Sequence, residues 1–211
     1  MIEVYTDASM KTINNRYFGC AGAICPSTND SNYIILPDCT NNQAELIAIY
    51  LGMELLAKYD DNDKFLYSDS KISVFSIRNW IHEWMKTSVN GVLYGSNNKP
   101  VKNQSIMIMI VNYVIQHNMI VNLRHQKGHV NFKNPRSLYE ANEVFASSNG
   151  YYLSPEKIYE ISYFNDMVDK QSRIKLDGID SKLFKCINSI DRKPLIRDIL
   201  PESKLFKNRI V

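Results

Sequence analysis

Four carboxylates are the residues of this 211-residue chain whose types and positions could do chemistry together. Asp7 and Asp69 each follow a β-rich run, Glu45 lies in the first turn of a helical run, and Asp169 lies in a late helical segment. Converging carboxylates repel and cannot all stay ionised without cations. Oxygen ligands favour Mg²⁺ or Mn²⁺, and two such ions about 3.5–4 Å apart catalyse phosphodiester hydrolysis. Taken singly, each acid is more simply a cap or a strand-end surface residue.

Sequence patterns predict the elements that must position these acids. Alternating apolar and polar residues predict a strand over residues 2–6 that ends at Asp7. Further strands are predicted over residues 18–25, 31–36, 64–68 and 120–126. Apolar residues at helical spacing predict helices over residues 40–58, 71–85, 101–117, 138–147, 155–163 and 165–176.

The order βββαβααβα predicts a mixed α/β fold in which helices pack on a sheet. Because no linker rich in Pro, Gly or Ser divides the chain, one domain is expected over residues 1–176. Residues 177–211 are expected to form a C-terminal helical extension packed on this domain.

Composition narrows the class of protein. With 45% hydrophobic and 22% charged residues, the chain is an ordinary globular one, and its net charge of +3 permits nucleic-acid binding without arguing for it. Four cysteines without a C-x-x-C pair favour reduced thiols over a zinc site or a disulfide scaffold. The N-terminus lacks a signal-peptide pattern and no apolar run could span a bilayer. A soluble, cytoplasmic protein without membrane contacts is therefore expected.

Five short motifs, in order along the chain, carry a resemblance to a known family. They are YTDAS at residues 5–9, TNNQAEL at 40–46, YSDS at 67–70, WIHEW at 80–84 followed by KPVKN at 99–103, and KGH at 127–129. Together they resemble the signature of type 1 ribonuclease H. The stretch from residue 80 to 103 resembles the handle region and following helix of the bacterial-type enzymes. The resemblance covers roughly residues 1–130 and 163–176.

The resemblance implies a ribonuclease H-like fold with a five-stranded mixed sheet flanked by helices. It implies cleavage of the RNA strand of an RNA–DNA hybrid by two Mg²⁺ ions, which Mn²⁺ can replace, giving 5′-phosphate and 3′-hydroxyl ends. By carry-over, Asp7 bridges both ions, Glu45 and Asp69 complete the site of one, and Asp169 helps to hold the other. His129 lies on a mobile loop and assists proton transfer or product departure. A monomer without an obligate protein partner is expected.

The family also implies a set of substrate-binding residues. The carried-over residues are Thr40, Asn41, Asn42, Gln43, Trp80, Lys99 and Lys102. Thr40 would grip a DNA-strand phosphate, amide side chains would read a minor groove that displays 2′-hydroxyls, and Trp80 would pack against the DNA strand. The simpler alternative is that Thr40 and Asn41 only cap a helix and that Trp80 only fills the core.

The chain departs from the family pattern in two places. Ala8 stands where the family has Gly, and the last motif, roughly Asn-Glu-x-x-Asp, has two candidates. Residues 142–146 (NEVFA) end in Ala146, whereas residues 165–169 (NDMVD) end in Asp169. We favour the second because metal chemistry needs the final carboxylate, with Asp166 as its near rival. Residues 131–161 then form an insertion.

Two alternatives to the hybrid-cleaving enzyme remain open on the sequence. The Ala8 substitution, the divided last motif and a handle poor in basic residues favour a catalytically weak RNA–DNA hybrid-binding protein. The shared carboxylates are also compatible with another nuclease of the ribonuclease H-like superfamily that acts on DNA.

Overall fold

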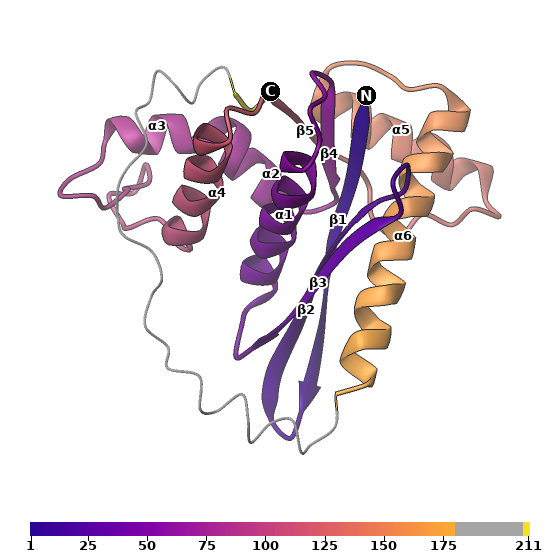
Figure 1. The fold of residues 1–211 in the computed structure, drawn as a ribbon, viewed down its shortest axis with the longest axis horizontal. Coiled ribbons are helices and arrows are strands. Elements are labelled where there is room, and N and C mark those ends of the chain that lie inside the picture. The colour runs from indigo at the N-terminus through magenta and orange to yellow at the C-terminus, as the bar shows by residue number, and fades with distance from the viewer. Residues whose placement is uncertain (180–208) are drawn as a thin grey trace.

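The centre of the fold is a five-stranded mixed sheet with the strand order β3-β2-β1-β4-β5 (Figure 1). The structure is a computed structural model that describes residues 1–179 and 209–211. The strands are β1 (Ile2–Ile13), β2 (Arg16–Cys25), β3 (Asp30–Pro37), β4 (Lys64–Ser68) and β5 (Val121–His125). β1, β2 and β3 are antiparallel neighbours, whereas β4 runs parallel to both β1 and β5. The predicted α/β fold with a five-stranded mixed sheet is confirmed.

The first strand is longer than predicted. β1 continues past Asp7 to Ile13, because its antiparallel pairing with β2 runs on from Asp7↔Gly22 to Ile13↔Arg16. Two asparagines with positive φ, at positions 14 and 15, then form the tight hairpin turn. Only the parallel pairing with β4 stops beside Asp7. The expectation that the strand ends at this residue is therefore wrong.

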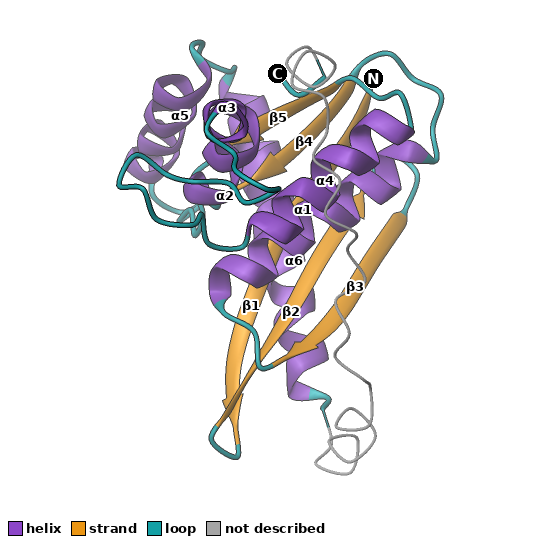
Figure 2. Ribbon diagram, turned by 90° about the vertical axis from the view of Figure 1, so that its left-hand side faces the viewer, coloured by secondary structure: helices purple, strands orange, loops and turns teal. Residues whose placement is uncertain are grey.

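Helices cover both faces of the sheet (Figures 1 and 2). α1 (Asn41–Ala57) and α4 (Gln104–Gln116) lie on one face, where buried Val4 and Leu66 of the strands meet Ile49 and Met53 of α1. α6 (Pro155–Asp177) crosses the opposite face along β1 and β2. Sheet residues of successive pleats are thus buried on opposite sides.

The helical stretch after β4 has an irregular centre. It consists of α2 (Lys71–Phe75), a π-helical turn (Ser76–Trp80) and α3 (Ile81–Lys86). Such turns are rare in proteins, and those that occur are often found at functional sites. The predicted helical region over residues 71–85 is therefore present, and the π-helical turn ends at Trp80, one of the expected substrate-binding residues.

The residues expected to form an insertion fold into α5 (Pro135–Asn149) and the first part of α6. Helices predicted over residues 155–163 and 165–176 are in fact one helix of 23 residues, capped by Ser154 and opened by Pro155. Phe145 and Ile161 pack with Tyr5 in a second core, on the face of the sheet that α6 covers. The region is thus continuous with the rest of the fold.

The end of the expected C-terminal extension lies beside β5. Arg209 and Val211 pair with β5, since Val121 N donates to Arg209 O at 2.7 Å and Val211 N donates to Val121 O at 2.9 Å. The predicted helical pieces of the tail lie outside the described residues. Within residues 1–179 and 209–211, no helix has the length and apolarity to cross a bilayer.

Candidate active site

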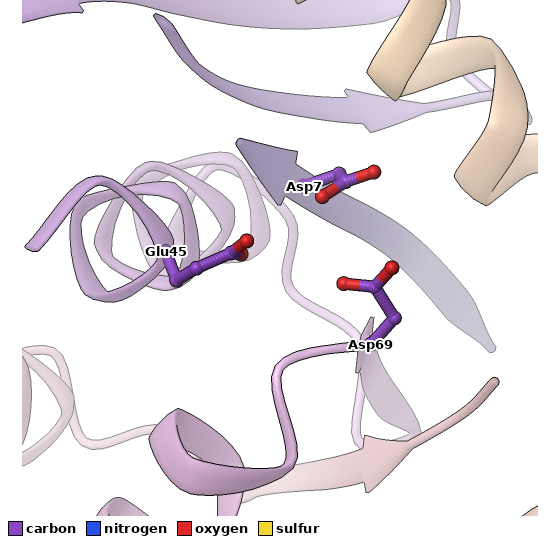
Figure 3. A group of neighbouring side chains, drawn as sticks. All are labelled: Asp7, Glu45 and Asp69. Atoms are coloured by element: carbon purple, nitrogen blue, oxygen red, sulfur yellow. The ribbon is translucent and has the colours of Figure 1, made fainter. Parts of the chain in front are cut away.

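Three carboxylates from three separate elements point toward one another at the end of β4 (Figure 3). The last parallel pair of β1 and β4 is Thr6↔Ser68, so Asp7 and Asp69 are the next residues of adjacent strands and share a face. Glu45 comes from α1, as its fifth residue and not in its first turn as expected. One ligand oxygen from each acid lies within 4.8 Å of the others.

Burial and mutual repulsion disfavour ionisation of all three groups. Burial raises the pKa of Asp7 well above its ordinary value, and the charges of Asp69 and Glu45 raise it further. The pKa of Glu45 is raised by burial, then by Asp69 and Asp169. Burial also raises the pKa of Asp69, against a lowering hydrogen bond from Asn165. Negative charge on these buried, neighbouring carboxylates is therefore unfavourable unless a cation compensates it.

The acidic cluster fits a divalent cation. Glu45 Oε2 is buried and has no hydrogen-bond partner among the described residues. Among residues 1–179 and 209–211, Asp7 Oδ1 accepts a hydrogen bond only from the neighbouring Ala8 N, at 2.7 Å. Hard carboxylate oxygens are the ligands that Mg²⁺ and Mn²⁺ prefer, and a bound cation removes the repulsion between them. Asp7, Glu45 and Asp69 are therefore a suitable donor set for such an ion.

Raised carboxyl pKa values make the stability of the metal-free protein depend on pH. The folded state holds more protons than the unfolded state between the unfolded value, about pH 4, and the raised values, so stability falls as pH rises through that window. We expect the thermal unfolding midpoint in EDTA to fall as pH rises from about 4. Saturating Mg²⁺ should restore it at neutral pH. A Glu45→Gln variant should show a flatter profile, and a midpoint that rises with pH equally in both proteins would contradict this.

Asp169 lies in the same cavity as the three acids. The cavity has a volume of about 630 Å³, and its lining includes Asp7, Glu45, Asp69, His129 and Asp169. Asp169 accepts hydrogen bonds from Ser9 Oγ at 2.5 Å and from Arg173 Nε at 3.0 Å. Arg173 also forms an ion pair with Asp169 Oδ2 at 2.7 Å. The fourth carboxylate is thus held in place by a hydroxyl and a guanidinium.

The two competing segments for the last motif occupy different places. Asn142 accepts from Leu153 N at 3.0 Å and donates to Leu153 O at 2.8 Å, which fixes the loop between α5 and α6. Ala146, in the same segment, is not among the described residues that line the acidic cavity. Asp166, the near rival of Asp169, instead pairs with Lys170 at 2.5 Å. Of Ala146, Asp166 and Asp169, only Asp169 lines the cavity that contains the other three acids.

His129 borders the acidic cavity on the loop after β5. Its side chain is 73% exposed, and Nδ1 lies 4.0 Å from Asp169 Oδ2. Its φ of 52° is in the left-handed region, which a non-glycine residue seldom adopts and which is common at functional sites. The imidazole is thus accessible to a substrate in the cavity.

The glycine before His129 leaves no room for a side chain. A methyl group at Gly128 would overlap Asp69 Oδ2. We expect Gly128→Ala to displace that carboxylate and to lower the phosphodiester hydrolysis expected from the sequence on the order of 10²-fold, the loss that a 1 Å misplacement can cause. Gly178→Ala, whose methyl group would meet only ordinary contacts, is the matched control. Equal initial rates for both variants would show that Asp69 tolerates the displacement.

Residues expected to bind substrate lie around the start of α1. Thr40 caps the helix, with its hydroxyl accepting from Gln43 N at 3.3 Å while Gln43 Oε1 accepts from Thr40 N at 2.9 Å. Thr40 therefore caps the helix, and its side chain remains exposed, so the expected contact with a phosphate stays a prediction. Asn41 lines the acidic cavity, whereas Asn42 lines a second cavity of about 690 Å³.

The other expected substrate-binding residues also line the second cavity. Trp80, Lys99 and Lys102 line it together with Trp84. Trp80 is 42% exposed and lies 6.0 Å from Trp84 between ring centroids, so it does not simply fill the core. The cavity thus combines exposed aromatic surface with two positive charges.

Several residues around the four acids were not identified as site residues from the sequence. Ser9, Arg173 and Asn165 contact the acids directly, whereas Gln126 contacts Asn165. Ser9, Gln126 and Arg173 were not singled out, and Asn165 was noted only as the start of a motif. Arg173 carries a usable signal, because it follows Asp169 by one helical turn. Gln126 carries none, since its contact with Asn165 depends on how β5 and α6 pack.

Comparisons with known proteins agree on one family. The RNase H family profile matches residues 1–143. The ribonuclease H of Rickettsia akari (strain Hartford) is 33% identical over 94 residues, 44% of this chain and 57% of that protein. The ribonuclease H of Rickettsia canadensis (strain McKiel) is 31% identical over 133 residues, 62% of this chain and 79% of that protein. The alignment thus spans little more than half the length of the first of these relatives.

One solved structure indicates the same fold. A foamy viral protease-reverse transcriptase in complex with dsDNA matches with a TM-score of 0.51 and 16% sequence identity. The match covers 71% of this chain and 95% of that one.

Because the family profile stops at residue 143, it does not include Asp169. The place of the fourth acid rests on the geometry of the cavity.

Proposed function

The chain belongs to the ribonuclease H family, and from this premise we propose that it is an endonuclease that hydrolyses the RNA strand of an RNA–DNA hybrid. One observation carries the proposal: Asp7, Glu45 and Asp69 converge in a cavity that also contains Asp169 and His129. Products with 5′-phosphate and 3′-hydroxyl ends would result. The cytoplasmic, monomeric state expected from the sequence is part of the same proposal.

We further propose Mg²⁺ as the physiological cation, with two ions per site and Mn²⁺ as a substitute. Bound ions would neutralise the carboxylates and stabilise the charge that develops on the phosphate. Asp7, Glu45 and Asp69 would hold one ion. Asp7 and Asp169 would hold the other, and Arg173 would have to loosen its ion pair with Asp169 to allow this.

His129 would handle a proton at the departing 3′-oxygen. Cleavage of the P–O3′ bond leaves an oxygen that must gain a proton, and histidine is suited to such transfer near neutral pH. Exposure of the ring and its position at the cavity edge allow it to reach a bound strand.

Two cavities on either side of the first turn of α1 suit the two strands of a duplex. Asn41 lines the acidic cavity and the adjacent Asn42 lines the second cavity. A hybrid laid across these asparagines would place its RNA strand at the carboxylates. The DNA strand would then lie against Trp80 and the two lysines. Amide side chains can both donate to and accept from the 2′-hydroxyls that distinguish RNA from DNA.

Cleavage of four labelled duplexes tests this function. RNA–DNA, DNA–DNA, RNA–RNA and DNA with a single ribonucleotide would each be incubated with Mg²⁺, Mn²⁺ or EDTA. We expect metal-dependent cleavage confined to the RNA strand of the hybrid, unchanged in an Asp166→Asn control. Cleavage of DNA–DNA would instead favour the DNA-directed nuclease. Hybrid binding without cleavage in either metal would favour the non-catalytic hybrid-binding protein.

A further inference from the structure

A buried pair of amide side chains adjoins the acidic cluster. Gln126 and Asn165 are 1% and 2% exposed, and Gln126 Nε2 donates to Asn165 Oδ1 at 2.7 Å. Asn165 Nδ2 in turn donates to Asp7 Oδ2 and to Asp69 Oδ2, both at 3.3 Å. A single NH₂ group thus connects the carboxylates of two adjacent strands.

The carboxylates determine how both amides are oriented. Carboxylates that hold a cation are ionised and only accept hydrogen bonds, so Asn165 turns its NH₂ group toward Asp7 and Asp69. The Asn165 oxygen then faces Gln126 and needs a donor. Within the amide of Gln126 the NH₂ group can donate and the oxygen cannot, so the NH₂ group faces Asn165. As a result Gln126 Oε1 is buried without a hydrogen-bond partner among the described residues.

The sheet brings Gln126 to this place. Thr6, Ser68 and His125 are the last paired residues of three adjacent parallel strands. Gln126 N continues the pattern by donating to Ser68 O at 3.0 Å. Gln126 therefore follows β5 just as Asp69 follows β4, on the sheet face that α6 covers, where Asn165 is located.

Fold stability alone does not explain a glutamine here. A buried carbonyl oxygen without a donor is unfavourable, and apolar side chains of similar size at both amide positions would avoid it. What the glutamine specifically provides is an NH₂ group aimed at Asn165. That group is useful only if the orientation of the Asn165 amide matters.

We propose that Gln126 is a positioning residue for the metal site, acting through Asn165. By fixing the Asn165 amide, it holds one oxygen each of Asp7 and Asp69, so that the remaining carboxylate oxygens face the cation. Residues that orient metal ligands in this way typically contribute 10- to 100-fold to metal affinity. This inference rests on the proposed metal-dependent function.

Calorimetric titration of Mg²⁺ and Mn²⁺ into the protein without substrate tests the proposal. Gln126→Met keeps the length of the side chain and removes both polar atoms. We expect it to weaken cation binding about 10-fold and to lower the thermal unfolding midpoint in EDTA only modestly, because Asn165 Oδ1 loses its donor. Gln116→Met, at an exposed position at the end of α4, is the matched control and should leave cation affinity unchanged.

A double-mutant cycle separates positioning from a general effect. If Gln126 acts through Asn165, the double variant Gln126→Met/Asn165→Ala should bind the cation as weakly as Asn165→Ala alone. Additive losses, or a Gln126→Met variant with wild-type affinity, would overturn the positioning role while leaving the proposed enzyme intact. A wild-type protein that binds neither cation would overturn both.

Discussion

Asp7→Asn is expected to abolish cleavage of the hybrid while leaving the fold intact. Asp7 touches both proposed ion sites, so its loss removes several kcal/mol of transition-state stabilisation. At tenfold per 1.36 kcal/mol, the rate should fall about 10⁴-fold. Asparagine has nearly the same shape and removes one of the repelling charges. The metal-free variant should therefore melt at the same or a higher temperature than the wild type at neutral pH.

Single-turnover cleavage and thermal unfolding of the same preparations check this prediction. Asp166→Asn is the matched control, because Asp166 pairs with Lys170 outside the acidic cavity. The control should cleave at nearly the wild-type rate. Retained activity in Asp7→Asn, in a protein that still unfolds cooperatively, would remove the metal assignment of this site.

Asp169→Asn is expected to lower the cleavage rate about 10³-fold, again through lost metal stabilisation. Asp169 shares the cavity with the other acids and perturbs the pKa of Glu45. Asparagine can still accept from Ser9, so the local packing of α6 should persist. Weaker binding of one of two cations, measured by calorimetry, should accompany the loss of rate.

Ala146→Asp in the Asp169→Asn background tests the competing motif. Ala146 lies in α5, in a segment whose Asn142 is committed to the loop at Leu153. An aspartate there should restore no activity. Recovery of cleavage by this second change would show that residues 142–146 supply the last ligand.

Much of the fold follows from local patterns in the sequence. Strands β2 to β5 and helices α1 and α4 lie within a few residues of their predicted bounds, because each has a clear period and turn residues at its ends. β1 was predicted too short, since an acid within a strand resembles a strand end. α6 was predicted as two helices, because polar Asn165 and Asp166 resemble a helix start. Both errors occur at polar residues that are buried in the site, Asp7 and Asn165.

The site itself was predictable only in part. Asp7, Glu45 and Asp69 could be identified because each lies in a short motif that resembles the family signature, although β1 does not end at Asp7 and Glu45 lies beyond the first turn of α1. The hydrogen bonds around them depend on tertiary packing between segments far apart in sequence. No local pattern indicates that Gln126 meets Asn165, or that Ser9 meets Asp169.

The position of α6 on the sheet also determines when the site can exist during folding. Ser9 and Asp169 are separated by 160 residues, and Asp7 and Asn165 by 158. Contacts this distant in sequence form late, because the intervening chain must first be ordered. A sheet with β1, β4 and α1 in place would hold three acids without the fourth. Docking of α6 therefore completes the site, and nuclease activity should appear in refolding only together with the last tertiary contacts.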